Sequence, residues 1–450
     1  MFTAAQAGMV KILKDKEVCV IVTLFCTPYG KFILERVLNK TSLSWLIGVT
    51  IIAKFVSLLG KKLSGMPMVN ELFEWVTLSF GVSALSSFLI VSWFARTKKQ
   101  GQKRDDTSAV QASHLNPTAR LGGLALFIAL IVAAALSHST DNWIAFVLLL
   151  VSAIPVFVIG LAEDLGYLAS PRKRLLAATV SGAMFIALMG QWVLHTGIPG
   201  LDVALRWSPF AVAFSLFLAV GISHSFNLID GLNGFAGFTA LAAALALAKI
   251  AHQSELTEHR DILLTIAAAV TGFLIFNFPF GKIFLGDAGA YVIGHLLFWM
   301  SVSILWNAPD ISPFAMLLIF FWPIADTLLA ITRRLSLGKP IVQPDKLHFH
   351  QLVMRGVEIV FLGRQRRRIA NPLAALFTLP FVFAPMITAV MFALDPGAAA
   401  MAYGLFAVVF IATYKTGMWI APKLRRSACP KKYVTANGAR RTAHGRRMKL

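Results

Sequence analysis

The stretch HSFNLIDGLNG, residues 224–234, places polar side chains between two strongly apolar segments. Asn227, Asp230 and Asn233 recur at every third residue, so a helical backbone would bring them close to one face. A carboxylate between apolar segments is costly to bury and indicates a functional site, unless it only caps a helix. Capping would explain Asp230 and leave both amides unexplained. The spacing therefore favours a binding or catalytic site.

Other acids also stand at the ends of apolar segments. Glu163 and Asp164 end one segment, and Asp287 begins another within the sequence GDAG. Mg²⁺ binds through one or two such carboxylates together with substrate phosphates. The alternatives are a helix cap for Asp287 and, for the acid pair, solvated loop acids that pair with Arg172 and Arg174. Acids at three separate segment ends favour metal and phosphate chemistry at one point.

The sequence NPTARLGG, residues 116–123, adds a base and two glycines before an apolar segment. Its Arg120 and glycine pair would let a phosphate approach the backbone closely, as in other phosphate-binding motifs. The alternative is an ordinary helix entry with a capping asparagine and a proline in the first turn.

Two histidines, His348 and His350, lie in the basic sequence PDKLHFHQ near Lys346 and Arg334. No third ligand follows at zinc spacing, so a zinc site is disfavoured. Contacts with phosphate groups and proton transfer fit these residue types better. A surface loop with incidental histidines is the alternative.

These residues belong to a very apolar chain of 450 residues, with 57% hydrophobic and 14% charged residues. Soluble domains carry about 25% charged residues. The apolar runs are roughly 17–25 residues long, which fits membrane-spanning helices and not the short alternating strands of a barrel. The sequence predicts an all-α, polytopic helical membrane protein.

About eleven transmembrane helices are predicted in a core of residues 72–419. They lie near 72–96, 121–137, 143–163, 175–191, 209–229, 231–250, 262–279, 288–306, 312–332, 372–393 and 399–419. Residues 1–71 form a leader with an interfacial helix and a further, marginal span. Residues 420–450 form a basic tail for which disorder is expected.

The net charge of +21 could indicate nucleic-acid binding, but the bases gather in alternate loops between the expected spans. This distribution is typical of cytoplasmic loops under the positive-inside rule. We therefore expect no nucleic-acid partner and a lipid bilayer environment. Nearly all the polar motifs fall on the same, cytoplasmic, side.

Five motifs, in one order, resemble the polyprenyl-phosphate N-acetylhexosamine-1-phosphate transferases of glycosyltransferase family 4: PTARLGG, GLAEDLGYLASPRKRL, NLIDGLNG, GDAGAYVIG and PDKLHFHQ. The resemblance covers residues 72–419. It implies transfer of an N-acetylhexosamine-1-phosphate from a UDP-sugar to undecaprenyl phosphate, with release of UMP. The enzyme would lie in the bacterial inner membrane, with its active site on the cytoplasmic face, and would initiate a surface polysaccharide such as an O-antigen.

The resemblance also implies roles for individual residues. Mg²⁺, with Mn²⁺ as an alternative, would be bound by Asp287 and Asp230, and catalytic roles fall to Asp164, Asp230, His348 and His350. Substrate binding would involve Asn227, Asn233, Glu163, Arg120, Arg174, Lys346 and Arg334. A homodimer is left open.

The chain departs from the family pattern at three positions. Glu163 stands where the first of two aspartates is usual, Asn233 replaces the last acid of DGLDG, and Gln351 replaces a histidine. The resulting HFHQ is more similar to the polysaccharide branch than to the peptidoglycan branch, the phospho-N-acetylmuramoyl-pentapeptide transferases. The alternatives are that branch, an inactive homologue, and a transporter of an anionic lipid or nucleotide. A transporter would place its polar groups near mid-membrane and show paired broken helices, and no such pairing is expected from this sequence.

Overall fold

A computed structural model describes residues 67–97, 118–136, 143–167, 170–338, 347–362 and 366–428. Within these ranges the chain is helical without strands, apart from one isolated backbone bridge between Ala119 and Ile283. The helices are α5 (Pro67–Thr97), α6 (Gly122–Leu136), α7 (Trp143–Ser152), α8 (Ile154–Asp164), α9 (Pro171–Met189), α10 (Pro199–Leu205), α11 (Ser208–Ile229), α12 (Phe235–Gln253), α13 (Thr257–Asn277), α14 (Gly286–Asn307), α15 (Pro313–Ile319), α16 (Phe321–Ser336), α17 (Phe349–Val357), the π-helical turn η3 (Glu358–Leu362), α18 (Arg367–Met391) and α19 (Pro396–Ala428). Most of the predicted leader and basic tail lies outside the described residues.

The described helices include seven that are long and apolar enough to cross a membrane, or nine if each of two bent pairs is one span. The pairs are α7 with α8, bent by 46°, and α15 with α16, bent by 74°, so the expectation of no paired broken helices is wrong. The prediction of a polytopic helical membrane protein is confirmed, whereas the count of about eleven is not. Of the remaining predicted spans, α6 has only 15 residues, and α9 carries Arg172, Lys173 and Arg174 in its first turn.

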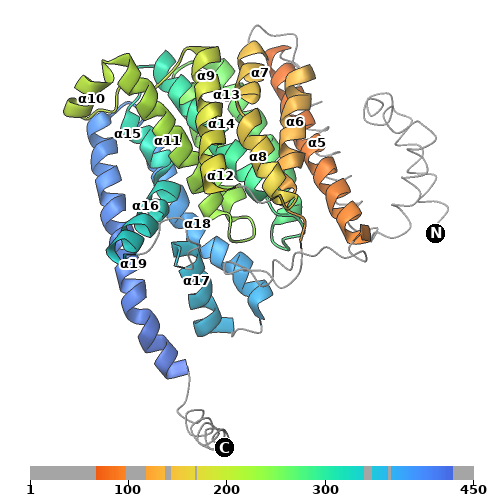
Figure 1. The fold of residues 1–450 in the computed structure, drawn as a ribbon, viewed down its shortest axis with the longest axis vertical. Coiled ribbons are helices and arrows are strands. Elements are labelled where there is room, and N and C mark those ends of the chain that lie inside the picture. The colour runs from red at the N-terminus through yellow and green to blue at the C-terminus, as the bar shows by residue number, and fades with distance from the viewer. Residues whose placement is uncertain are drawn as a thin grey trace, which may run out of the picture. The chain divides into compact units, whose positions relative to one another are not determined.

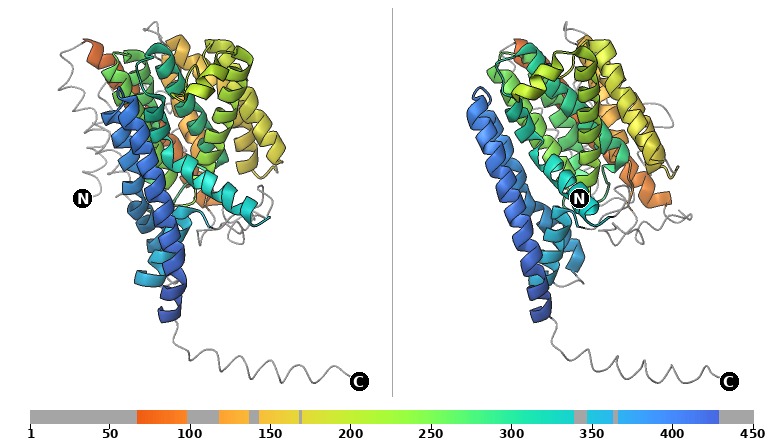
Figure 2. Two further views of the ribbon diagram at one scale, coloured as in Figure 1. Left: turned by 90° about the vertical axis from the view of Figure 1, so that its left-hand side faces the viewer. Right: turned by 60° about the vertical axis from the view of Figure 1, so that its left-hand side comes forward.

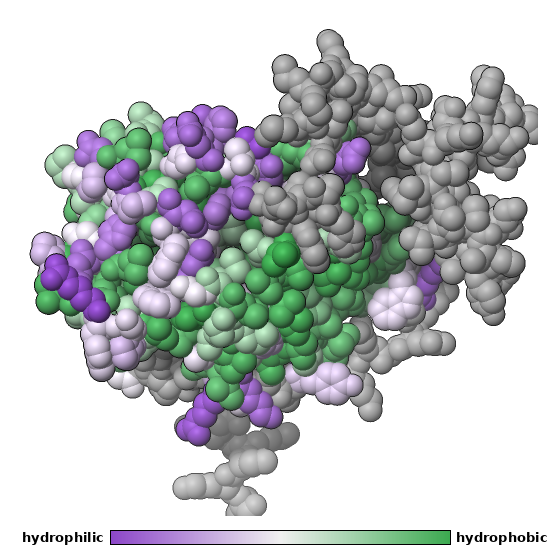
Figure 3. All heavy atoms as spheres, turned by 90° about the horizontal axis from the view of Figure 1, so that it is seen from above, coloured by the Kyte–Doolittle hydropathy of each residue, from purple (hydrophilic) through white to green (hydrophobic). Residues whose placement is uncertain are grey.

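Helix α14 runs through the middle of the bundle (Figure 1). It is buried from Gly286 to Ile304, because α6, α8, α11 and α12 pack around it. Apolar side chains point outward elsewhere, as Phe217 on α11 and Met401 on α19 do with 72% and 74% exposure. Exposed side chains of this kind face lipid in a membrane protein. Figure 3 views the end of the bundle that carries α10 and shows apolar surface beside polar patches.

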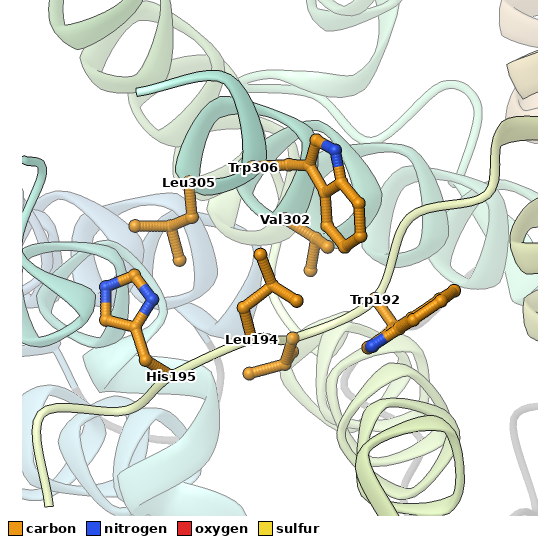
Figure 4. Close-up of a pocket in the computed structure, with 7 residues that line it drawn as sticks. Trp192, Leu194, His195, Val302, Leu305 and Trp306 are labelled. Carbon is orange, nitrogen blue, oxygen red and sulfur yellow. The ribbon is translucent and has the colours of Figure 1, made fainter. Parts of the chain in front are cut away.

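The two ends of the bundle differ. Helix α10 lies at one end and α17 at the other, where α19 also extends beyond the other helices (Figures 1 and 2). A small apolar hollow lies between the extended segment 192–195 and the end of α14, lined there by Val302 and Trp306 (Figure 4). Residue 287 lies at the other end of α14, about 22–29 Å away at 1.5 Å per residue. The hollow and the acidic residues therefore belong to opposite ends.

Candidate active site

The site is built around the start of α14. Both oxygens of Asp164, at the end of α8, accept backbone hydrogen bonds of 2.9 Å, one from Asp287 and one from Ala288. The Asp164 side chain is fully buried. The first N–H groups of a helix have no partner within the helix, and a carboxylate is favoured there by the helix dipole. Asp164 therefore caps α14 and fixes the position of Asp287.

Asp287 is held from two further elements. Its Oδ1 accepts 2.9 Å hydrogen bonds from the guanidinium of Arg120 and from Nδ2 of Asn227. The Arg120 guanidinium also lies 3.6 Å from Asp164. Residues far apart in the sequence, predicted separately from four motifs, are thus in contact.

Glycines allow the backbones of α6 and α8 to pack directly against the start of α14. Gly122 and Gly123 donate backbone hydrogen bonds of 2.9 and 2.8 Å to the carbonyls of Phe284 and Leu285. A Cβ on Gly123 would collide with the backbone of α14, and a Cβ on Gly160 of α8 would lie 2.5 Å from Ala288. The glycine pair, interpreted from the sequence as room for a phosphate, therefore receives the start of α14 instead.

Glu163 also lies near Asp287. Its Oε1 is 3.3 Å from Arg174, as the ion-pair alternative predicts, and its carboxyl group also faces that of Asp287. The second oxygen, Oε2, is buried without a hydrogen-bond partner among the described residues. A buried acceptor without a partner costs about 1–3 kcal/mol, so a bound cation or hydrogen-bond donor would stabilise this group.

Asp230 follows the last residue of α11 and lies near the backbone N–H of Gly286. Burial raises the pKa of Asp230 from 3.8 to about 7; the positive charge of Arg120 opposes this shift, and the negative charge of Asp287 adds to it. The group is therefore easily protonated near neutral pH and would be ionised by a nearby cation.

Asn233 lies in a separate network of amides. Its Nδ2 donates to the carbonyl of Pro279 at 2.8 Å, and its backbone N–H donates to Oδ1 of Asn371 at 2.7 Å. Asn277 continues this network through bonds to the backbone of Gly234 and Ile283. In the structure Asn233 joins the 230–234 turn to the segment before α14. Its predicted role in substrate binding stays a prediction.

The two histidines are positioned by an acid that was not selected from the sequence. Asp326 of α16 is fully buried and accepts hydrogen bonds of 2.9 Å from Nδ1 of His348 and from the backbone N–H of Phe349. The signal was present, since Asp326 is the one charged residue of FWPIADTLLA. A single acid in an apolar helix is a candidate functional residue.

Helix α16 buries two of its charged residues and exposes two of its leucines. Asp326 and Arg334 are buried, whereas Leu328 and Leu335 are 52% and 61% exposed. The neighbouring Arg333 donates hydrogen bonds to the carbonyl of Leu347 and to the hydroxyl of Tyr414. The helix therefore holds residues 347–349 from one side. Lys346 lies outside the described residues, and the roles of Lys346 and Arg334 stay predictions.

His350 packs against Gly231, in the segment 224–234 that also carries Asp230. Its ring is completely buried, and its Nε2 lies 2.7 Å from where a Cβ of Gly231 would stand. Nδ1 lies 3.7 Å from Asp326, and burial is the main cause that lowers the pKa of His350. A neutral ring at this place connects the histidine segment with the turn that carries Asp230.

Comparison with known proteins identifies the family. Residues 145–305 match the model of glycosyl transferase family 4. The decaprenyl-phosphate N-acetylglucosaminephosphotransferase of Mycolicibacterium smegmatis is 30% identical over 342 residues, which cover 70% of this chain and 80% of that protein. The chain belongs to this family. It is a membrane-embedded phosphotransferase, as the sequence resemblance predicted.

Other relatives fall in two groups. The probable undecaprenyl-phosphate N-acetylglucosaminyl 1-phosphate transferase of Bacillus subtilis is 28% identical over 64% of this chain and 79% of its own length. The phospho-N-acetylmuramoyl-pentapeptide-transferase of the same organism is also 28% identical, over 61% of this chain and 87% of its own length. The family match includes Asp164, Asp230 and Asp287 and ends before Asp326 and the histidines.

Proposed function

We propose that this family member transfers an N-acetylhexosamine-1-phosphate from a UDP-sugar to undecaprenyl phosphate and releases UMP. One observation carries the proposal: Asp164, Asp230 and Asp287 meet Arg120 at one end of a membrane-spanning bundle. An enzyme that joins a lipid in the bilayer to a nucleotide from water needs its polar groups at such an end. A transporter would instead distribute them near mid-membrane.

The acidic residues offer carboxylate oxygens to a divalent cation, although no three of the described His, Cys, Asp and Glu residues are already arranged around one point. The carboxyl groups of Glu163 and Asp287 face each other, Asp230 lies within electrostatic reach of Asp287, and Oε2 of Glu163 lacks a partner in the described part of the chain. These are oxygen donors, which Mg²⁺ prefers, and Mn²⁺ accepts the same set. Asp287 and Asp230 would hold the ion. When bound, it supplies positive charge that neutralises the diphosphate of the sugar donor.

The protein's own groups account for the rest of the reaction. An oxygen of the lipid phosphate forms a bond to the sugar-bearing phosphorus, and the bond from that phosphorus to the oxygen of the leaving UMP breaks. Arg120, which contacts both Asp164 and Asp287, is positioned to stabilise negative charge on the phosphates. Such transfers depend on positioning and electrostatic stabilisation more than on covalent chemistry by the protein.

The orientation and the biological role are further parts of the proposal. The base-rich loops near the acids favour the cytoplasmic face of a bacterial inner membrane. The HFHQ sequence favours initiation of a surface polysaccharide such as an O-antigen. The peptidoglycan branch is the second candidate, because relatives of that branch reach 29% identity, as in Bacillus mycoides.

The proposal is tested by UMP release from purified protein supplied with undecaprenyl phosphate, Mg²⁺ and a panel of UDP-sugars. We expect release with a UDP-N-acetylhexosamine and none with UDP-N-acetylmuramoyl-pentapeptide. The variant Asp287→Asn should lose turnover, whereas Asp310→Asn, an exposed acid just after the other end of α14, should not. Absence of release with every donor would refute the transferase activity, and full activity in Asp287→Asn would refute the metal assignment.

A further inference from the structure

His224 of α11 is a polar residue that the site described above does not use. It lies one helical turn before Asn227, which binds Asp287. Its Nδ1 lies 2.9 Å from the carbonyl of Val220. A carbonyl can only accept, so Nδ1 carries the proton and Nε2 of the neutral ring carries a lone pair. That Nε2 is buried and has no hydrogen-bond partner within the described ranges.

The surroundings of His224 connect it to the reaction site. Its ring lies 5.0 Å from that of Tyr291, one turn after Asp287 on α14. The Tyr291 hydroxyl lies near Arg174, and Arg174 pairs with Glu163. Arg174 and Asp287 both lie within electrostatic reach of His224. The unpartnered atoms of His224 and Glu163 therefore border one cluster, which suggests that a ligand completes it.

The approach to His224 comes from the bilayer. On the same face of α11, Phe217 is 72% exposed, and no other atom lies within 4 Å of a Cβ placed on Gly221. Since α11 is a membrane-spanning helix, this open face meets lipid and not the aqueous solution that supplies a nucleotide sugar. A ligand that reaches His224 along this face would be a lipid with a polar head.

We propose that His224 binds the phosphate of the lipid acceptor through Nε2, which accepts a hydrogen bond from the protonated oxygen of the phosphate monoester. Arg174, as a guanidinium, donates to the remaining oxygens. The monoanion of a phosphate monoester offers both a hydroxyl donor and charged acceptors, which matches this pair. The proposal rests on the proposed transferase function and adds the position and the binding group of its lipid substrate.

The test measures binding of undecaprenyl phosphate to the full-length protein in detergent micelles, without a sugar donor. His224→Phe keeps a ring and removes the acceptor, and we expect it to raise the Kd about tenfold, which corresponds to about 1.4 kcal/mol. His224→Gln, which again offers an acceptor, should restore most of the affinity. His195→Phe, in the hollow at the opposite end (Figure 4), should bind like the wild type.

Two parallel ligands separate the explanations. Undecaprenol without phosphate and UDP-GlcNAc should each bind His224→Phe as they bind the wild type. The proposal is wrong if undecaprenyl phosphate binds this variant unchanged, if undecaprenol is weakened equally, or if UDP-GlcNAc is the ligand that is weakened.

The lipid site at His224 and the transferase reaction can be refuted independently of each other. A wild-type protein that releases no UMP but binds undecaprenyl phosphate through His224 would refute the transferase reaction and retain this site. If the wild type releases UMP but His224→Phe binds undecaprenyl phosphate with an unchanged Kd, the transferase reaction is retained and this site is refuted. As a second readout in an active protein, the KM for undecaprenyl phosphate should rise in His224→Phe while the KM for the UDP-sugar stays constant.

Discussion

Asn233→Asp would restore the acid that is usual in the family, and we expect it to damage this protein. The Nδ2 of Asn233 donates to the carbonyl of Pro279 at 2.8 Å. A carboxylate has no hydrogen to donate, so this carbonyl would lose its partner and face a negative charge. The neighbouring bond from the backbone of residue 233 to Asn371 would remain.

The cost of this substitution follows from burial. Asn233 is only 6% exposed, so water cannot replace the lost donor freely. An unpaired buried carbonyl costs about 1–3 kcal/mol, and the buried charge adds to it, which gives about 2–4 kcal/mol in total. We expect the purified variant to melt several degrees below the wild type in the same detergent.

Asn307→Asp provides the matched control for this experiment. Asn307 also donates from Nδ2 to a carbonyl at 2.8 Å, that of Ser303, but it is exposed at the other end of α14. Solvent can replace that bond, so a change below about 0.5 kcal/mol is expected. If Asn233→Asp melts at or above the wild-type temperature, the structural role assigned to Asn233 is wrong.

Three further substitutions test other contacts. Gly123→Ala should lower the melting temperature by the equivalent of about 1–3 kcal/mol, because the added Cβ collides with the backbone of α14. Gly81→Ala, where the added Cβ has open space, should leave the melting temperature unchanged. Equal melting temperatures of the two variants would contradict the close packing at Gly123. Burial raises the pKa of Asp230 from 3.8 to about 7, so the folded wild type loses up to about 4 kcal/mol as pH rises through this range. Asp230→Asn in EDTA should therefore be stabilised more at pH 8 than at pH 5, and a pH-independent difference in melting would count against the shift. In UMP release, Asp326→Ala and His348→Ala should each cost about 10–100-fold, and the double variant no more than the worse single one, because each substitution removes the hydrogen bond that joins the two residues. Losses that multiply would show that the two residues act separately.

The convergence of Asp164, Asp230 and Asp287 was predictable from the sequence. Each acid follows or begins an apolar segment, and a membrane restricts segment ends to two surfaces. The distribution of bases then assigned the three ends to the same surface. The helices themselves were predictable for the same reason, since long apolar runs in lipid leave few alternatives to a helix.

Other features depend on contacts that a linear pattern does not contain. The glycines of residues 122–123 are typical of a phosphate-binding loop, yet here they receive a helix start. Helix α16 follows a 74° bend after α15, and its Asp326 is hydrogen-bonded to His348. The spacing of these two residues in the sequence does not indicate this contact. In the same way, the motif alone presents Asn233 as the replacement of a usual acid. Its hydrogen bond to the carbonyl of Pro279 gives it a structural role that the motif does not indicate.

The double hydrogen bond from the start of α14 to Asp164 affects how this position can vary during evolution. A replacement must both suit the chemistry beside Arg120 and satisfy two backbone N–H groups, and asparagine offers only one accepting oxygen. Glu163 is under less restriction, because its ion pair with Arg174 leaves its second oxygen without a partner in the described structure. Adjacent acids in one motif are therefore subject to unequal selection. Sequence drift of the kind already present at Glu163 is expected to be far rarer at Asp164.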